Sequence, residues 1–181
     1  MKIPFSPPDI STLEIEEVAD ALRSGWITTG PRTKELERRI AATVGTARCA
    51  CLNSQTACAE MALHLLGVGA GDEVIVPVYT YTASASVVCH VGAQVVFVDC
   101  QRDSYEMDYD AVEAAITERT KAIMICNPNN PTGYLYTRRE MNQIRDLVKK
   151  YDLYLFSDEV YREFIYTGSP YISACHLEGI E

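Results

Sequence analysis

The chain has 181 residues, of which 48% are hydrophobic and 23% charged, and its net charge is −9. These values are ordinary for one globular domain, which would bury roughly 70% of the surface of its unfolded chain. An acidic chain argues against nucleic-acid and anionic-membrane partners, because both select a basic face. No apolar run reaches the roughly 18 residues of a membrane span, and the first residues have no signal-peptide core. We expect a cytoplasmic protein.

The cysteines indicate neither a metal site nor a disulfide framework. Their number is seven, and no pair of CxxC units of the zinc-binding kind is present. Several lie in apolar runs, as Cys89 and Cys126 do, so we expect buried, reduced thiols. Cys49 and Cys51 would share one face of a strand, with no further ligands nearby in the sequence. We expect no metal.

Helical and strand-like periods alternate along the chain. Capping-box patterns at residues 11–14 (STLE) and 137–140 (TRRE) predict helices that run to about residues 24 and 150, and Pro31 opens another helix. The other expected helices cover residues 55–66, 82–89 and 109–118, and the expected strands cover residues 48–52, 73–76, 94–98, 122–126 and 153–156. This alternation predicts a three-layer α/β domain, with a mostly parallel sheet between helices on both faces.

A nucleotide-binding fingerprint is not supported. The glycine cluster at residues 67–71 (GVGAG) follows a helix and precedes a strand, which reverses the strand-to-helix turn that cradles a pyrophosphate. Glycines in this place are typical of helix C-caps. A Rossmann-type oxidoreductase is therefore disfavoured, and nicotinamide binding would be needed to revive it.

Polar residues follow the expected strands at the edge where open α/β sheets bind ligands. Residues 53–57 (NSQTA) join a strand to a helix, and such a helix start suits a phosphate, although taken alone it equally predicts an ordinary serine cap. Tyr81 can stack on a flat ring or belong to the core. Asp158 ends an apolar run, and a buried carboxylate needs a cation or several donors. A protonated pyridine nitrogen is one such cation.

Taken together, these residues match the needs of pyridoxal phosphate (PLP). The phosphate needs a helix N-terminus, which residues Ser54, Gln55, Thr56 and Ala57 would form, and the ring needs the flat face of Tyr81. The phenolic oxygen needs donors, which Asn130 and Tyr161 supply. The ring nitrogen needs an anion, Asp158, that keeps it protonated, because the protonated ring is the electron sink of this cofactor.

Two family resemblances strengthen this interpretation. Residues 3–122 resemble the DegT/DnrJ/StrS-type sugar aminotransferases, through residues 25–31 (GWITTGP), 53–57, 71–77 (GDEVIVP) and 79–85 (YTYTASA). This resemblance implies that Thr56 and Ala57 contact the cofactor phosphate and that Tyr81 stacks on the ring.

Residues 124–181 resemble class I, aspartate-aminotransferase-type enzymes, through residues 127–133 (NPNNPTG) and 157–161 (SDEVY). This second resemblance implies that Asn130 and Tyr161 meet the phenolic oxygen and that Asp158 meets the pyridine nitrogen. Both families share the type I fold, so both halves fit one architecture.

The resemblances also imply an incomplete, composite enzyme. We expect residues 1–181 to form part of a PLP-binding large domain, with a seam at residues 121–127 and without the C-terminal small domain. In both families the lysine that holds the cofactor follows the position matching Glu181. None of the five lysines present, at positions 2, 34, 121, 149 and 150, is placed to replace it, so no catalytic residue is assigned.

The expected function is PLP-dependent transfer of an amino group from a small donor to a keto acceptor, a nucleotide-linked keto sugar being one candidate. Turnover by this chain is expected to be absent or severely impaired. The relatives imply a homodimer. The alternative is a non-catalytic remnant of a PLP pocket, or an interaction fragment.

Overall fold

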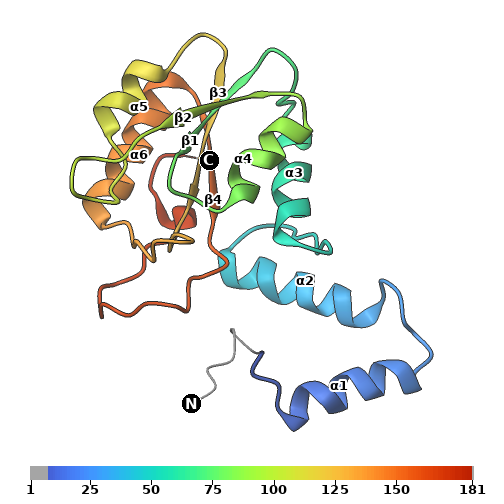
Figure 1. Cartoon of the computed structure of the whole chain (residues 1–181). Coiled ribbons are helices and arrows are strands. Elements are labelled where there is room, and N and C mark those ends of the chain that lie inside the picture. The colour runs from blue at the N-terminus through green and yellow to red at the C-terminus, as the bar shows by residue number, and fades with distance from the viewer. Residues whose placement is uncertain (1–7, 181) are drawn as a thin grey trace. The chain divides into compact units, whose positions relative to one another are not determined.

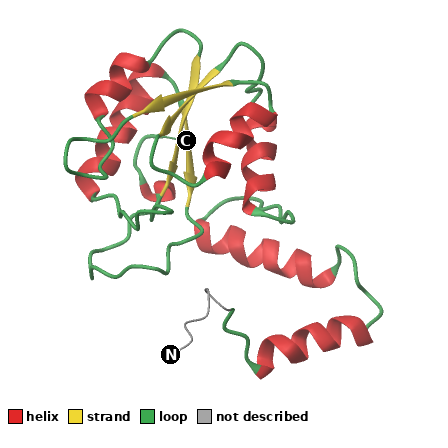
Figure 2. Ribbon diagram, in the orientation of Figure 1, coloured by secondary structure: helices red, strands yellow, loops and turns green. Residues whose placement is uncertain are grey.

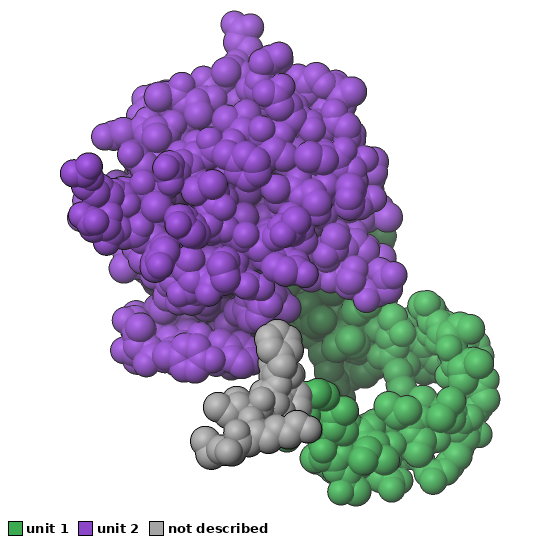
Figure 3. Space-filling model, viewed as in Figure 1, with its two compact units in different colours: residues 1–51 green, residues 52–181 purple. Residues whose placement is uncertain are grey.

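The computed structural model describes residues 8–180. The chain divides into two compact units, residues 1–51 and residues 52–181, which we describe separately (Figure 3). Among residues 8–180 we find no helix with the length and hydropathy of a transmembrane span. The expectation of one partial large domain over residues 1–181 stays a prediction.

The first unit contains two helices, α1 (Thr12–Arg23) and α2 (Pro31–Val44). The capping box that opens α1 is confirmed, because Ser11 and Glu14 exchange side-chain and backbone hydrogen bonds. Between the helices, the indole of Trp26 lies against Gly30, where a Cβ atom would come within 1.7 Å of the ring. Only glycine fits there. The predicted apolar stripe of α1 is exposed, and none of the helix's residues is buried.

The strand expected at residues 48–52 is wrong. The backbone there pairs with no described strand, and the N–H of Cys51 instead donates to the Glu37 carboxylate at 3.0 Å. A strand is stable only when its backbone groups find a neighbouring ladder. Cys49 and Cys51 therefore do not share a strand face.

The structure pairs none of the described cysteines in a disulfide, but most of them are not buried. Cys126 is buried, whereas Cys89 lies near the exposed end of its helix, so the expectation of burial is wrong for Cys89. Among the described residues, no group of three or more histidine, cysteine, aspartate or glutamate side chains is arranged to hold a metal ion.

The second unit is built on a parallel sheet with the strand order β2-β1-β3-β4 (Figures 1 and 2). The strands are β1 (Glu73–Pro77), β2 (Gln94–Val98), β3 (Thr120–Cys126) and β4 (Tyr154–Asp158). In the central register, Ile75 of β1 lies opposite Val96 on one side and Ile123 on the other. β3 in turn pairs with β4 through Ile123 and Leu155.

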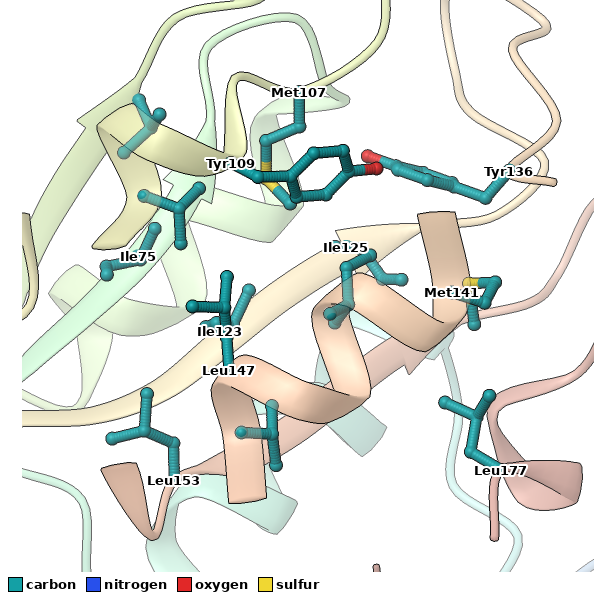
Figure 4. Close-up of a cluster of buried hydrophobic side chains, with 14 of the residues drawn as sticks. Ile75, Met107, Tyr109, Ile123, Ile125, Tyr136, Met141, Leu147, Leu153 and Leu177 are labelled. Atoms are coloured by element: carbon teal, nitrogen blue, oxygen red, sulfur yellow. The ribbon is translucent and has the colours of Figure 1, made fainter. Parts of the chain in front are cut away.

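Helices cover both faces of this sheet, so the predicted three-layer α/β fold is confirmed. The helices of this unit are α3 (Gln55–Leu65), α4 (Thr82–His90), α5 (Tyr109–Ala115) and α6 (Arg138–Tyr151), followed by a short 3₁₀ turn, η1 (Ala174–His176). Val74 and Val76 pack with residues of α3 and α4. Ile75 and Ile123 face the other way and pack with residues of α5 and α6, including Leu147 (Figure 4). The side-chain alternation of a strand thus divides the core into two clusters.

The end of α5 and the presence of η1 are among the differences from the sequence expectation. α5 ends at Ala115 rather than near residue 118, because Ile116 is already extended with ψ 128° and Thr120 Oγ1 accepts the N–H of Thr117 at 2.9 Å. This side-chain bond replaces the helical one. The turn η1 was not expected, since its three residues show no periodic pattern.

The order of the strands indicates which edge of the sheet would bind a ligand. The chain passes from β1 to β2 on one side, and then crosses back over β1 to β3 on the other side. The order therefore reverses between β1 and β3, and open α/β sheets bind ligands at the carboxyl ends of strands at such a point. The loops that follow β1 and β3 carry Tyr81 and Asn130 to that edge, and Asp158 ends β4 there.

Candidate active site

The candidate phosphate cradle is the start of α3. Ser54 is the N-cap, and its Oγ accepts the N–H of Ala57 at 3.1 Å. The N–H groups of Gln55 and Thr56 belong to the first turn, where a helix offers no acceptor of its own. α3 leads into the amino end of β1, so it runs back across the sheet and begins at the carboxyl edge. Topology alone places this cradle beside the other candidate residues.

Tyr81 lies between β1 and α4, in an extended conformation with φ −64° and ψ 140°. Its side chain is 53% exposed, which excludes the alternative of a core tyrosine. The ring is therefore available to a ligand at the carboxyl edge. Stacking on a cofactor ring stays a prediction.

The loop after β3 is fixed to the loop after β1 by Asn129. Its Nδ2 donates to the carbonyl oxygen of Tyr79 at 3.0 Å, and its Oδ1 accepts the hydroxyl of Thr132 at 2.9 Å. The N–H of Gly133 donates to the carbonyl oxygen of Asn129 at 2.8 Å, and Gly133 has φ 69°, which favours glycine. The NPNNPTG sequence therefore forms a tight, internally bonded loop against the end of β1.

Asn130 faces the loop after β4. Its Nδ2 donates to the hydroxyl of Tyr161 at 3.0 Å. The amide has a second N–H, and the tyrosine hydroxyl retains its own proton, so both groups can donate to one further oxygen. The structure thus brings together the two residues predicted to meet the phenolic oxygen.

Asp158 is the last residue of β4, and its side chain is half-buried. The Oδ1 atom accepts the N–H of Val160 at 3.1 Å. Desolvation raises the pKa of Asp158 and the neighbouring charge of Glu159 adds to this, while the Val160 hydrogen bond opposes it. None of the groups that shift this pKa is a cation. A cationic ligand nitrogen would supply the missing charge, which is what a protonated pyridine offers.

Three residues of this region were missed at the sequence level. Asn127 and Asn129 tie loops together, and Glu159 bonds to a segment 14 residues further along the chain. They act on site residues and do not reach toward a ligand. The NPNNPTG and SDEVY motifs contain them, but only long-range pairing assigns their partners.

The lysines of the second unit lie away from this edge, as expected. Lys121 is the second residue of β3, at its amino end, and Lys149 and Lys150 belong to the last turn of α6. Lys121 and Lys149 line a cavity of about 670 Å³ together with Leu153 and with Tyr154, the first residue of β4. That cavity is at the amino edge, opposite the candidate site.

Comparison with known proteins assigns the chain to an aminotransferase family. The sequence profile of the DegT/DnrJ/EryC1/StrS aminotransferase family matches residues 8–160. The UDP-4-amino-4-deoxy-L-arabinose--oxoglutarate aminotransferase of Shewanella sediminis is 38% identical over 156 residues, which are 86% of this chain and 39% of that protein. The chain belongs to the DegT/DnrJ/EryC1/StrS aminotransferase family, which depends on PLP.

Solved structures agree in fold. Spr1654 from Streptococcus pneumoniae, in its PMP form, has a TM-score of 0.75 and 50% identity, covering 88% of this chain and 42% of that one. The aromatic aminotransferase from Pyrococcus horikoshii has a TM-score of 0.81 and 26% identity, covering 94% of this chain and 48% of that one. The chain therefore resembles both sugar and class I-like aminotransferases, and spans less than half the length of each of these relatives.

The predicted seam at residues 121–127 stays a prediction. The family profile runs across it to residue 160. β3 pairs with β1 and with β4 through this stretch, and Ile123 and Ile125 are fully buried. The two sides of the seam therefore share one sheet and one core.

Proposed function

We propose that this chain forms the cofactor-binding part of a PLP-dependent aminotransferase that passes an amino group to the keto group of a sugar. The observation that carries the proposal is the convergence of Asp158, Asn130 and Tyr161 at the carboxyl edge of the sheet. The name of the Shewanella relative supports a sugar as the acceptor and an amino acid as the donor, because it pairs a UDP-amino sugar with oxoglutarate.

The chemistry of the donor set fits the cofactor. The N-terminus of α3, with Ser54, Gln55, Thr56 and Ala57, would hold the phosphate through first-turn N–H groups and hydroxyls. Tyr81 would cover one face of the ring, and Asn130 and Tyr161 would donate to its phenolic oxygen. Bound PLP supplies an electron sink for the carbanion of the amino donor, provided that its ring nitrogen is protonated.

Asp158 has the central electrostatic role in this proposal. Its half-buried carboxylate lies where desolvation disfavours the charge, so a cation beside it is strongly preferred over water. The residue would hold the proton on the ring nitrogen. The Val160 N–H fixes the orientation of Asp158, because it bonds Oδ1 from two residues further along.

No lysine of the second unit lies beside these residues, so we propose cofactor binding without turnover by this chain alone. The test is to incubate the purified protein with PLP, reduce it with borohydride, and map the modified peptides by mass. We expect saturable binding of PLP with only scattered labelling. Stoichiometric labelling of one lysine, or transamination above a cofactor-only control, would contradict the proposal.

The second candidate function is a non-catalytic remnant of the pocket that packs against a partner. It is supported by the exposed apolar side chains of α1, such as Leu13 at 76% and Leu22 at 65% exposure. Absence of saturable PLP binding, together with self-association, would favour it. We further propose a cytoplasmic homodimer with small-molecule substrates and no nucleic-acid or membrane partner, in line with the net charge of −9.

A further inference from the structure

We propose that Glu159 is a positioning residue that holds Asp158 and Tyr161 in their cofactor-binding arrangement through the segment 172–174. This inference rests on the proposed function, since it concerns the same pocket. Asp158 precedes Glu159 in the chain and Tyr161 follows it by two residues, so an anchor at Glu159 acts on both. The Glu159 side chain itself points to a different part of the chain.

The Glu159 carboxylate accepts three hydrogen bonds. Oε2 accepts the Ser173 hydroxyl at 2.7 Å, and Oε1 accepts the N–H of Ala174 at 2.7 Å and the Ser157 hydroxyl at 3.1 Å. Ser173 is only 5% exposed. Hydrogen bonds to an ionised acceptor are the strong ones, and three of them define the position of this side chain. The turn at residues 158–161 is thereby joined to the start of η1.

The same segment also holds the loop after β3. The carbonyl oxygen of Ile172 accepts a hydrogen bond from Asn127 Nδ2 at 3.1 Å, and Asn127 is fully buried. The Asn127 N–H in turn donates to the carbonyl oxygen of Asp158 at 2.8 Å. Residues 172–174 therefore bridge the loop that carries Asn130 and the turn that carries Asp158. This closed set of contacts defines the relative position of the two loops.

A positioning role and an electrostatic role predict different results for substitution by glutamine. In Glu159→Gln the amide oxygen still accepts from Ala174 and Ser157, and the amide nitrogen can donate to the Ser173 hydroxyl. The geometry is kept while the charge is lost. Glu159→Ala loses both. The matched control is Glu163→Ala, because the Glu163 side chain is 87% exposed and pairs with the neighbouring Arg162.

The experiment measures PLP binding by equilibrium titration for the four proteins, with circular dichroism to verify folding. We expect Glu159→Ala to weaken binding about tenfold or more, Glu159→Gln to stay within about threefold, and Glu163→Ala within about twofold of the unsubstituted chain. A folded Glu159→Ala that binds within about twofold, or a Glu159→Gln as weak as the alanine variant, would overturn the proposal. If Glu159→Ala does not fold, Ser173→Ala replaces it, with a loss of about threefold expected and no loss overturning the proposal.

Amide hydrogen exchange separates this inference from the proposed function. If the unsubstituted chain binds no PLP, the proposed function fails, but the anchor is still tested. In Glu159→Ala the amides of Arg162 and Asn127, which bond to the carbonyl oxygens of residues 159 and 158, should exchange about tenfold faster, while those of β1 do not change. Unchanged exchange at both amides would overturn the anchor itself.

Discussion

Replacement of Asn127 by alanine should strongly destabilise the second unit. The side chain is fully buried, its Oδ1 accepts the N–H of Tyr136 at 3.1 Å, and its Nδ2 donates to the carbonyl oxygen of Ile172 at 3.1 Å. Alanine leaves one buried donor and one buried acceptor without a partner. Each such group costs about 1 to 3 kcal/mol, so we expect the free energy of unfolding to fall by about 2 to 6 kcal/mol.

The assay is equilibrium urea unfolding followed by circular dichroism, with Asn142→Ala as the control. Asn142 lies on α6 and only accepts a hydrogen bond from Arg145, so its replacement should change the free energy of unfolding by less than about 0.5 kcal/mol. Asn127→Asp keeps the acceptor but turns a carboxylate toward the Ile172 oxygen, and should be no more stable than Asn127→Ala at neutral pH. An Asn127→Ala protein as stable as the control would refute the reasoning.

Three further predictions concern single side chains. Asp158→Asn should leave the ligand-free chain as stable or more stable at pH 7, because the pKa of Asp158 is raised in the folded chain and its ionisation costs stability as the pH rises above the ordinary pKa of 3.8. The gain in stability should vanish at acidic pH. Urea unfolding measured as a function of pH tests this, and a loss of stability at pH 7 would contradict it. Glu73→Ala should cost about 1 to 3 kcal/mol by urea unfolding, because the Thr117 hydroxyl loses its buried acceptor while the exposed Arg119 side chain can turn to water; a cost near zero would contradict a structural role. Ser54→Ala should lower the free energy of unfolding by about 1 kcal/mol, because the N-cap hydrogen bond of α3 is lost, and it should also weaken PLP binding. A change in neither quantity would contradict a role of Ser54 in capping the helix and in binding the cofactor.

The layers of the fold could be predicted because their signals are local. The consecutive apolar residues of β1 and β3, such as Ile123, Met124 and Ile125, indicate strands buried on both faces, and the structure confirms it. The strand expected at residues 48–52 has a similar composition but no ladder to join. Whether an apolar run becomes a strand depends on distant partners, which the local pattern does not contain.

The sequence predicts residues that would face a ligand, but it does not identify the residues that support them. Asn130 and Tyr161 stand in recognisable motifs and do meet, at 3.0 Å. Asn127 and Glu159 stand in the same motifs, yet their partners lie 45 and 14 residues away, in a segment without a motif of its own. Residue types at the ends of strands predict which side chains could bind a ligand. The hydrogen bonds that position those side chains can be identified only in the folded chain.

The central claim, that PLP binds at the carboxyl edge of the sheet, is tested most directly by amide chemical-shift mapping. The ¹⁵N-labelled chain would be titrated with PLP, and the shifts at residues 54–57, 81, 130 and 158–161 compared with those around Lys121 and Lys149 at the opposite edge. We predict saturable shifts in the first group, with the largest reduced in Asp158→Asn. Shifts confined to the surroundings of the lysines would contradict the claim.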